Sequence, residues 1–160
     1  LSLHDALPIS PRMGRTILLG FLAGFAAVLV FHQGTAWLLH MLTAKAQIGV
    51  GVFGRVGAPF NMAPVPPFGV PTVLSAAFWG GVWGVVLAAV LRGTRLPDLL
   101  FGFVFGALAL TLVAFTLVAS LKGLPTFAGG NQRIWWRALL LNGAWGWGAA
   151  LLLRFLRRSG

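Results

Sequence analysis

Side chains that could carry out acid–base, nucleophilic or metal chemistry are scarce in this sequence. Two of its 160 residues are acidic and three are histidines, and cysteine and tyrosine are absent, so proton transfer would rest on histidine or lysine. His32 and His40 are eight residues apart, about 12 Å along a helix, which is too far for both to bind one metal ion. Phosphate-binding glycine loops, zinc-binding His-Glu-x-x-His helices and nucleophile elbows are missing. The sequence therefore predicts that the protein is not an enzyme and binds no metal or cofactor.

Three polar side chains nevertheless interrupt long apolar runs, namely His32, Gln33 and Asn142. A polar group at membrane depth is costly and usually faces the interior of a helix bundle or a wet cavity. These three residues are therefore the candidate intramembrane polar site. The alternative is a structural role, in which His32 and Gln33 form hydrogen bonds across helices to Asn142 or to the indoles of Trp83 and Trp145.

The elements that must position these residues are membrane-spanning helices. Of the residues 58% are hydrophobic and 9% charged, and the apolar runs are about 20 residues long, as a bilayer requires. The sequence predicts an all-α membrane protein with spans at about 16–42, 72–91, 98–121 and 134–155. A cleaved signal peptide is the alternative for the first run, since Ala44-Lys45-Ala46 resembles a cleavage site, but the run is longer than the apolar region of a signal peptide.

Small residues recur every four positions on two of these spans, and we call these two sets the seams. The first seam is Ala76, Gly80, Gly84 and Ala88, and the second is Ala138, Asn142, Gly146 and Ala150. In lipid, such a stripe lets another helix approach closely.

The second pair of spans echoes the first pair. Residues 80–84 align with residues 142–146, and residues 20–24 align with residues 102–106, with offsets of 62 and 82 positions. The offsets differ because the first pair holds about 20 extra residues between its spans. The pattern predicts two similar hairpins that form a parallel internal repeat, related by a pseudo-twofold axis along the membrane normal.

The extra residues form a Gly/Pro-rich segment at 47–71, where helical periodicity fails. Because the segment is apolar, we expect it to lie on the membrane surface or to dip back between the helices. An extended, polyproline-like stretch at Ala63–Pro67 that docks a partner is the alternative.

The first ten residues stand apart from the rest. Leu1 to Ile9 resemble the translation of a short-read sequencing adapter, so we expect residues 1–12 to be an artefact or a disordered N-terminus. The remaining chain, residues 13–158, is predicted to be one integral membrane domain.

The net charge of +10 comes from basic residues beside the apolar runs. This placement favours membrane anchors that meet anionic lipid over nucleic-acid binding. With the N-terminus inside, seven arginines would be cytoplasmic and five cations would lie outside, a bias that predicts both termini in the cytoplasm. The inner set is Arg12, Arg15, Arg92, Arg95, Arg154, Arg157 and Arg158, and the outer set is Lys45, Arg55, Lys122, Arg133 and Arg137.

Several blocks resemble a family of small bacterial membrane proteins of uncharacterised role. The blocks are Phe31-His32-Gln33-Gly34, the run from Ala63 to Pro71, Phe78-Trp79-Gly80-Gly81, the run from Leu121 to Pro125, and the run from Leu141 to Gly146. The resemblance implies the bacterial inner membrane and brings no activity or site residues with it.

Two functions fit these observations. Abundant seams and few reactive groups favour a non-enzymatic membrane protein that associates with itself or serves as a small subunit of a membrane complex. The alternative is a small-solute or ion transporter or channel with a polar pathway near His32, Gln33 and Asn142.

Overall fold

The computed structural model describes residues 11–158 and contains four helices that are long and apolar enough to cross a membrane. We call them spans 1 to 4, and they cover Met13–Lys45, Thr72–Gly93, Asp98–Leu121 and Gln132–Arg158. The chain is thus a multi-pass, largely helical membrane protein. Pro11 and Arg12, which we expected in a disordered N-terminus, belong to the first helix instead. The adapter-like stretch at residues 1–10 lies outside the described residues.

Spans 1 and 3 are built from α-helical pieces joined by wider, π-helical turns. In such a turn a backbone N–H reaches the carbonyl five residues earlier, as Gln33 does with Val28. Span 1 consists of α1 (Pro11–Ala27), a π turn (Val28–His32), α2 (Gln33–His40) and a second π turn (Met41–Lys45). Span 3 consists of α5 (Asp98–Val104), a π turn (Phe105–Leu110), α6 (Thr111–Val113), a π turn (Ala114–Val118) and α7 (Ala119–Leu121). Spans 2 and 4 are single helices, α4 (Thr72–Gly93) and α8 (Gln132–Arg158).

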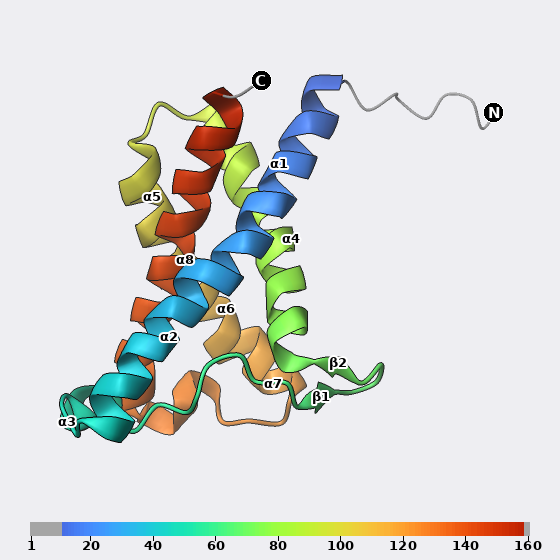
Figure 1. Cartoon of the computed structure of the whole chain (residues 1–160). Helices are drawn as coiled ribbons and strands as arrows, with labels where there is room; N and C mark the ends of the chain where they lie inside the picture. The colour runs from blue at the N-terminus through green and yellow to red at the C-terminus, as the bar shows by residue number, and fades with distance from the viewer. Residues whose placement is uncertain (1–10, 159–160) are drawn as a thin grey trace.

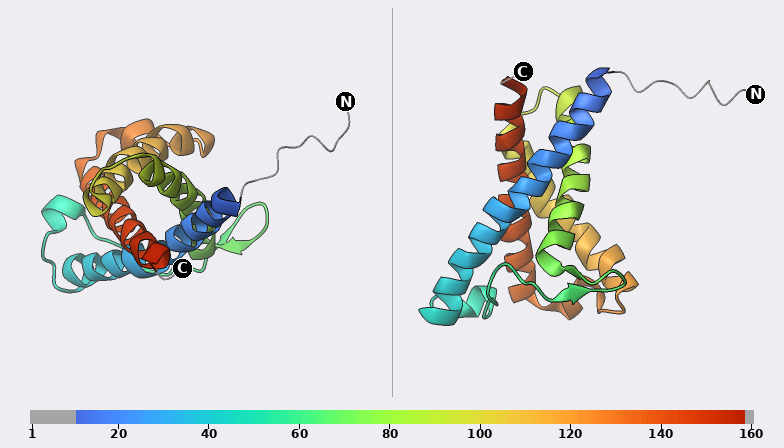
Figure 2. Two further views of the ribbon diagram at one scale, coloured as in Figure 1. Left: turned by 90° about the horizontal axis from the view of Figure 1, so that it is seen from above. Right: turned by 45° about the vertical axis from the view of Figure 1, so that its right-hand side comes forward.

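The helices form a bundle with two distinct ends (Figures 1 and 2). The termini end carries the start of α1, the turn between α4 and α5, and the end of α8. The loop end carries the segments that join span 1 to span 2 and span 3 to span 4. Span 1 packs against span 2, span 3 packs against span 4, and spans 1 and 4 pack against each other.

Most residues of the two seams are buried inside this bundle. Gly20 and Gly24 of span 1 lie so close to span 2 that a Cβ on Gly24 would overlap the carbonyl oxygen of Gly80, and one on Gly84 would overlap that of Gly20. In the other pair, a Cβ on Gly106 would overlap the carbonyl oxygen of Asn142. Such contact of backbones is what small residues permit between helices in lipid. The seam residues that are buried are Gly80, Gly84, Ala88, Gly146 and Ala150, whereas Ala76, Ala138 and Asn142 are half-buried.

The Gly/Pro-rich segment runs across the loop end of the bundle (Figure 1). It contains one turn of helix, α3 (Val50–Phe53), and a two-residue antiparallel pair, β1 (Pro64–Val65) with β2 (Val70–Pro71). The rest has no regular structure, in keeping with its glycines and prolines.

Polar side chains of span 1 hold this segment at its backbone. Thr43 donates a hydrogen bond to the Leu39 carbonyl (2.7 Å) and accepts one from the N–H of Val56 (3.0 Å). His40 Nδ1 donates to the carbonyl of Val56 (2.8 Å). Val56 is buried as a result, so the segment is packed onto span 1 rather than loosely tethered.

Candidate intramembrane cavity

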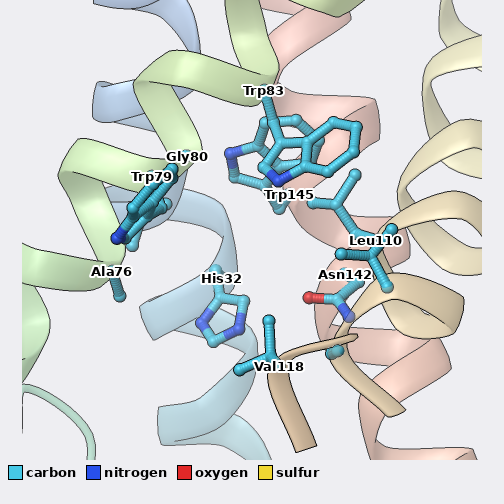
Figure 3. Close-up of a pocket in the computed structure, with 12 residues that line it drawn as sticks. His32, Ala76, Trp79, Gly80, Trp83, Leu110, Val118, Asn142 and Trp145 are labelled. Atoms are coloured by element: carbon cyan, nitrogen blue, oxygen red, sulfur yellow. The ribbon is translucent and has the colours of Figure 1, made fainter. Parts of the chain in front are cut away.

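A cavity of about 180 Å³ lies between the helices, and all four spans line it (Figure 3). Its lining residues are Val28, His32, Ala76, Trp79, Gly80, Trp83, Leu110, Val113, Ala114, Val118, Asn142 and Trp145. Three of the four π turns of spans 1 and 3 contribute lining residues, namely Val28–His32 from span 1 and Phe105–Leu110 and Ala114–Val118 from span 3. Such turns recur at functional sites because they redirect side chains relative to a regular helix.

His32 and Asn142 face the cavity with polar atoms that a solute could contact. In Figure 3 the imidazole of His32 projects into the space, and the amide oxygen of Asn142 points toward it from the opposite side. The amide nitrogen of Asn142 donates to Thr111 Oγ1 (3.0 Å), which fixes the amide in this orientation. His32 Nδ1 is 3.5 Å from Gln33 Nε2, a distance at the weak limit of hydrogen bonding.

Two tryptophans close the cavity toward the termini end. Trp145 is buried and its indole N–H donates to the carbonyl of Gly24 (2.9 Å), which joins span 4 to span 1. Trp83 meets Phe105 edge to face, with ring centroids 6.0 Å apart, which joins span 2 to span 3. These contacts link all four helices at one level, and His32 and Asn142 lie on the loop-end side of that layer.

The structure separates the three residues of the predicted polar site. His32 and Asn142 line the same cavity, whereas Gln33 does not. Gln33 is buried, and its side-chain oxygen accepts a hydrogen bond from the backbone N–H of Phe60 (2.7 Å) in the Gly/Pro-rich segment. Its contact matches the alternative structural role, but the partner is the backbone of Phe60 rather than Asn142 or an indole.

Three tryptophans of the lining and the hydroxyl that orients Asn142 were not among the predicted site residues, although Trp83 and Trp145 were named as possible partners of His32 and Gln33. Trp79, Trp83 and Trp145 line the cavity, and Thr111 holds the amide. A signal for two of the indoles was present, because Trp83 and Trp145 sit at the middle of their spans, away from the interfaces where tryptophan is usually enriched.

The seam residues take part in packing within one chain. Gly84 and Gly146 lie against Gly20 and Gly102, so these faces are already covered by the protein's own helices. The seams are therefore no evidence for contact with another protein.

The chemistry available in the cavity is that of binding. No carboxylate, lysine or arginine lines it, and the described residues hold no group of three potential metal ligands. An imidazole, an amide oxygen and indole faces can give or accept hydrogen bonds and can contact apolar or cationic surface. The cavity can therefore enclose a small solute and form hydrogen bonds with it.

Comparisons of the chain with protein-family models, with curated proteins and with solved structures give no match.

Proposed function

We propose that the chain is a small membrane transport protein whose solute binds in the cavity between His32 and Asn142. The observation that carries this proposal is that all four spans line one cavity, with polar groups from spans 1 and 4 facing each other across it. Polar side chains in a membrane protein that face such a space mark solute and ion pathways. A site at the interface between helix pairs is also where rocking of one pair against the other would open it.

The size and lining of the cavity define the class of solute. An apolar cavity of about 150 Å³ accommodates benzene, so the 180 Å³ present here fits a solute of similar size. Indole faces attract cations, and the imidazole and the amide oxygen supply hydrogen bonds. The proposed solute is accordingly small, and either neutral or singly cationic.

We also propose that the chain consists of two similar hairpins. Four pairs of cavity residues support this arrangement, because each pair is separated by the offset seen in the sequence. Positions 82 apart supply Val28 with Leu110 and His32 with Ala114, and positions 62 apart supply Gly80 with Asn142 and Trp83 with Trp145. In this arrangement the cavity lies on the pseudo-twofold axis, and each hairpin contributes one polar group at a position where the other has a small residue.

For the localisation we propose the bacterial inner membrane, with both termini in the cytoplasm. Within residues 11–158, the termini end carries seven arginines on short turns and helix ends, and the loop end carries five cations, of which three are arginines and two are lysines. Dense cations on short segments favour the cytoplasmic side. Because the chain lacks cysteine, single cysteines at Thr94 and Gly57 can be labelled from either side. Labelling of position 94 from outside in intact cells would contradict this orientation.

Assembly with a second copy or with other membrane subunits remains the second candidate, and it rests on surfaces other than the seams. Many large apolar side chains of spans 1 and 3 are exposed, as expected for helices that meet lipid or another helix. Native mass spectrometry of gently extracted protein distinguishes the two, because a subunit would retain a partner polypeptide and a self-contained transporter would not.

The test of the transport proposal is flux through purified protein in liposomes. The probes are protons, tetramethylammonium and benzyl alcohol, which sample the charge and size that the cavity admits. We expect the flux of at least one probe to exceed that of protein-free vesicles and to fall when His32 and Asn142 are replaced by alanine. His40→Ala is the matched control, since His40 is a histidine of the same span outside the cavity. Flux that survives the double replacement would overturn the site, and no flux of any probe would overturn transport.

A further inference from the structure

A second cavity, at the termini end, has a different character from the central one. It has a volume of about 490 Å³ and lies between spans 1, 2 and 4. Its lining residues are Arg15, Thr16, Leu19, Ala88, Leu91, Arg92, Leu153 and Arg157. Three arginines, one from each of three helices, thus converge on one space from segments far apart in the sequence.

Contacts with the protein hold two of these guanidinium groups at the cavity wall. Arg157 Nη2 donates to the carbonyl of Ala88 (3.1 Å), and Arg92 Nη1 donates to Thr16 Oγ1 (3.0 Å). A guanidinium has five N–H donors in a planar fork, so the single bond of Arg157 leaves further donors for a ligand. The arginines are therefore partly preorganised.

Among the described residues, no carboxylate lines this cavity. Asp98 is the one acidic residue between residues 11 and 158, and it does not line the cavity. Planar arginine forks match the oxygens of phosphate groups and bind them through paired hydrogen bonds.

The remaining wall of the cavity is apolar, with Leu19, Leu91 and Leu153 below the arginines. A free phosphate ion would make no use of such a wall. A phospholipid would, because its phosphate is joined to a glycerol and to acyl chains. The cavity also lies where α4 and α8 end, which is the depth of the headgroups for helices that span the bilayer (Figure 1).

We propose that this cavity is a binding site for the phosphate group of an anionic phospholipid, held by Arg15, Arg92 and Arg157. Basic pockets between membrane helices are suited to such headgroups. The site is separate from the central cavity and shares no lining residue with it. Its occupation would tie spans 1, 2 and 4 together at the end where the two helix pairs meet.

The experiment is native mass spectrometry of the full chain from nanodiscs that contain equal amounts of phosphatidylglycerol and phosphatidylcholine. We expect retention of phosphatidylglycerol, and a loss of about fivefold for each arginine replaced by glutamine at positions 15 and 157. The matched control is the double replacement of Arg154 and Arg158, which removes the same charge from exposed positions of span 4 outside the cavity. We expect the control to change retention by less than about twofold.

Three outcomes would overturn the proposal. Equal retention of both lipids would show that the cavity does not select an anionic headgroup, and an equal loss in the control would show that surface charge rather than the cavity selects the lipid. Displacement of phosphatidylglycerol by millimolar inorganic phosphate or glycerol phosphate would show a site for a soluble phosphate. If the double variant does not fold, Arg15→Gln alone decides, because Arg15 is exposed and its replacement leaves the Arg157–Ala88 contact in place.

Discussion

The two packed helix pairs, span 1 with span 2 and span 3 with span 4, cross through equivalent contacts but differ at the cavity. In both pairs a glycine of the first helix touches the backbone of the second: Gly24 touches Gly80, and Gly106 touches Asn142. The second pair has an amide side chain at this point, and the first has none. A Cβ on Gly80 would overlap Cγ2 of Val28 and lie 3.1 Å from Nε1 of Trp145, so the space that an amide would need is already filled.

The imidazole shows the opposite asymmetry. His32 faces the cavity from span 1, and the position 82 residues later is Ala114, which faces it from span 3. The contacts that the two pairs share are backbone contacts of small residues, whereas the groups that distinguish them are the polar ones. The crossing of small residues is therefore the scaffold of each pair, and the proposed solute chemistry resides in the polar groups that differ between the pairs.

The largest effect is expected where the shared scaffold is broken. Replacing Gly84 or Gly146 by leucine would force a side chain into the carbonyl oxygens of Gly20 or Gly102. Overpacking ordinarily destabilises a folded protein by about 1–3 kcal/mol. Because the added side chains would meet backbone that cannot move aside, we expect a loss of stability at the top of this range or above it. We expect each to lose most of its folded, monodisperse protein in size-exclusion chromatography and thermal unfolding.

The matched control for these variants is Gly34→Leu, since no atom lies within 4 Å of a Cβ built at this helical glycine. Similar losses at Gly84 and Gly146 would agree with two equivalent crossings. A large loss at one position and none at the other would show that the two crossings are not equivalent.

The next effect concerns the polar groups that distinguish the pairs. His32→Ala is expected to lower solute flux about tenfold, equivalent to about 1.4 kcal/mol, because it removes the imidazole from the cavity. Adding Ala114→His to this variant returns an imidazole to the same cavity from span 3. We expect partial recovery of flux in liposomes, and no recovery would contradict the proposed equivalence of the two positions.

The apolar helices could be predicted from the sequence because a bilayer demands runs of about 20 apolar residues, and the structure confirms four of them. The seams could be predicted as places of close helix contact. Periodicity alone could not show whether the partner was the same chain, because it marks a face of a helix and not what covers that face. Only the structure shows Gly84 against Gly20.

Only part of the candidate site could be predicted from the sequence, again because a sequence pattern does not show what a side chain contacts. The membrane depth of His32 and Gln33 follows from counting residues, but adjacent residues of a helix point about 100° apart, so depth did not decide which one meets the cavity. The partner of Gln33 is the backbone of Phe60, in a segment whose path no periodic pattern describes. Thr111 was hidden because a threonine on an apolar helix carries no sign of its partner until the facing helix is known.

A smaller effect should separate the two central tryptophans. Trp145→Phe removes the indole bond to the buried carbonyl of Gly24, whereas no hydrogen bond from the Trp83 indole is present in the described part of the chain. A hydrogen bond of this kind contributes about 1 kcal/mol. We therefore expect Trp145→Phe to lower the apparent melting temperature in detergent by more than Trp83→Phe does. Equal shifts would mean that ring packing, and not the bond between spans 4 and 1, sets the stability of this layer.

The smallest effect tests the feature that only the first pair possesses, the segment between its spans. Thr43→Val deletes the hydroxyl that joins the helix to the N–H of Val56, and the loss should be local because the seam contacts lie more than two helical turns away along span 1. We expect faster hydrogen exchange and faster proteolysis at residues 54–60, with the melting temperature nearly unchanged. Thr116→Val is the matched control, since Thr116 makes the same bond to the carbonyl four residues earlier (2.7 Å) but holds no loop. Unchanged hydrogen exchange in Thr43→Val would show that burial of Val56, rather than the hydroxyl, fixes the segment. A fall in melting temperature as large as that of the glycine variants would show that the segment belongs to the scaffold that the two pairs share.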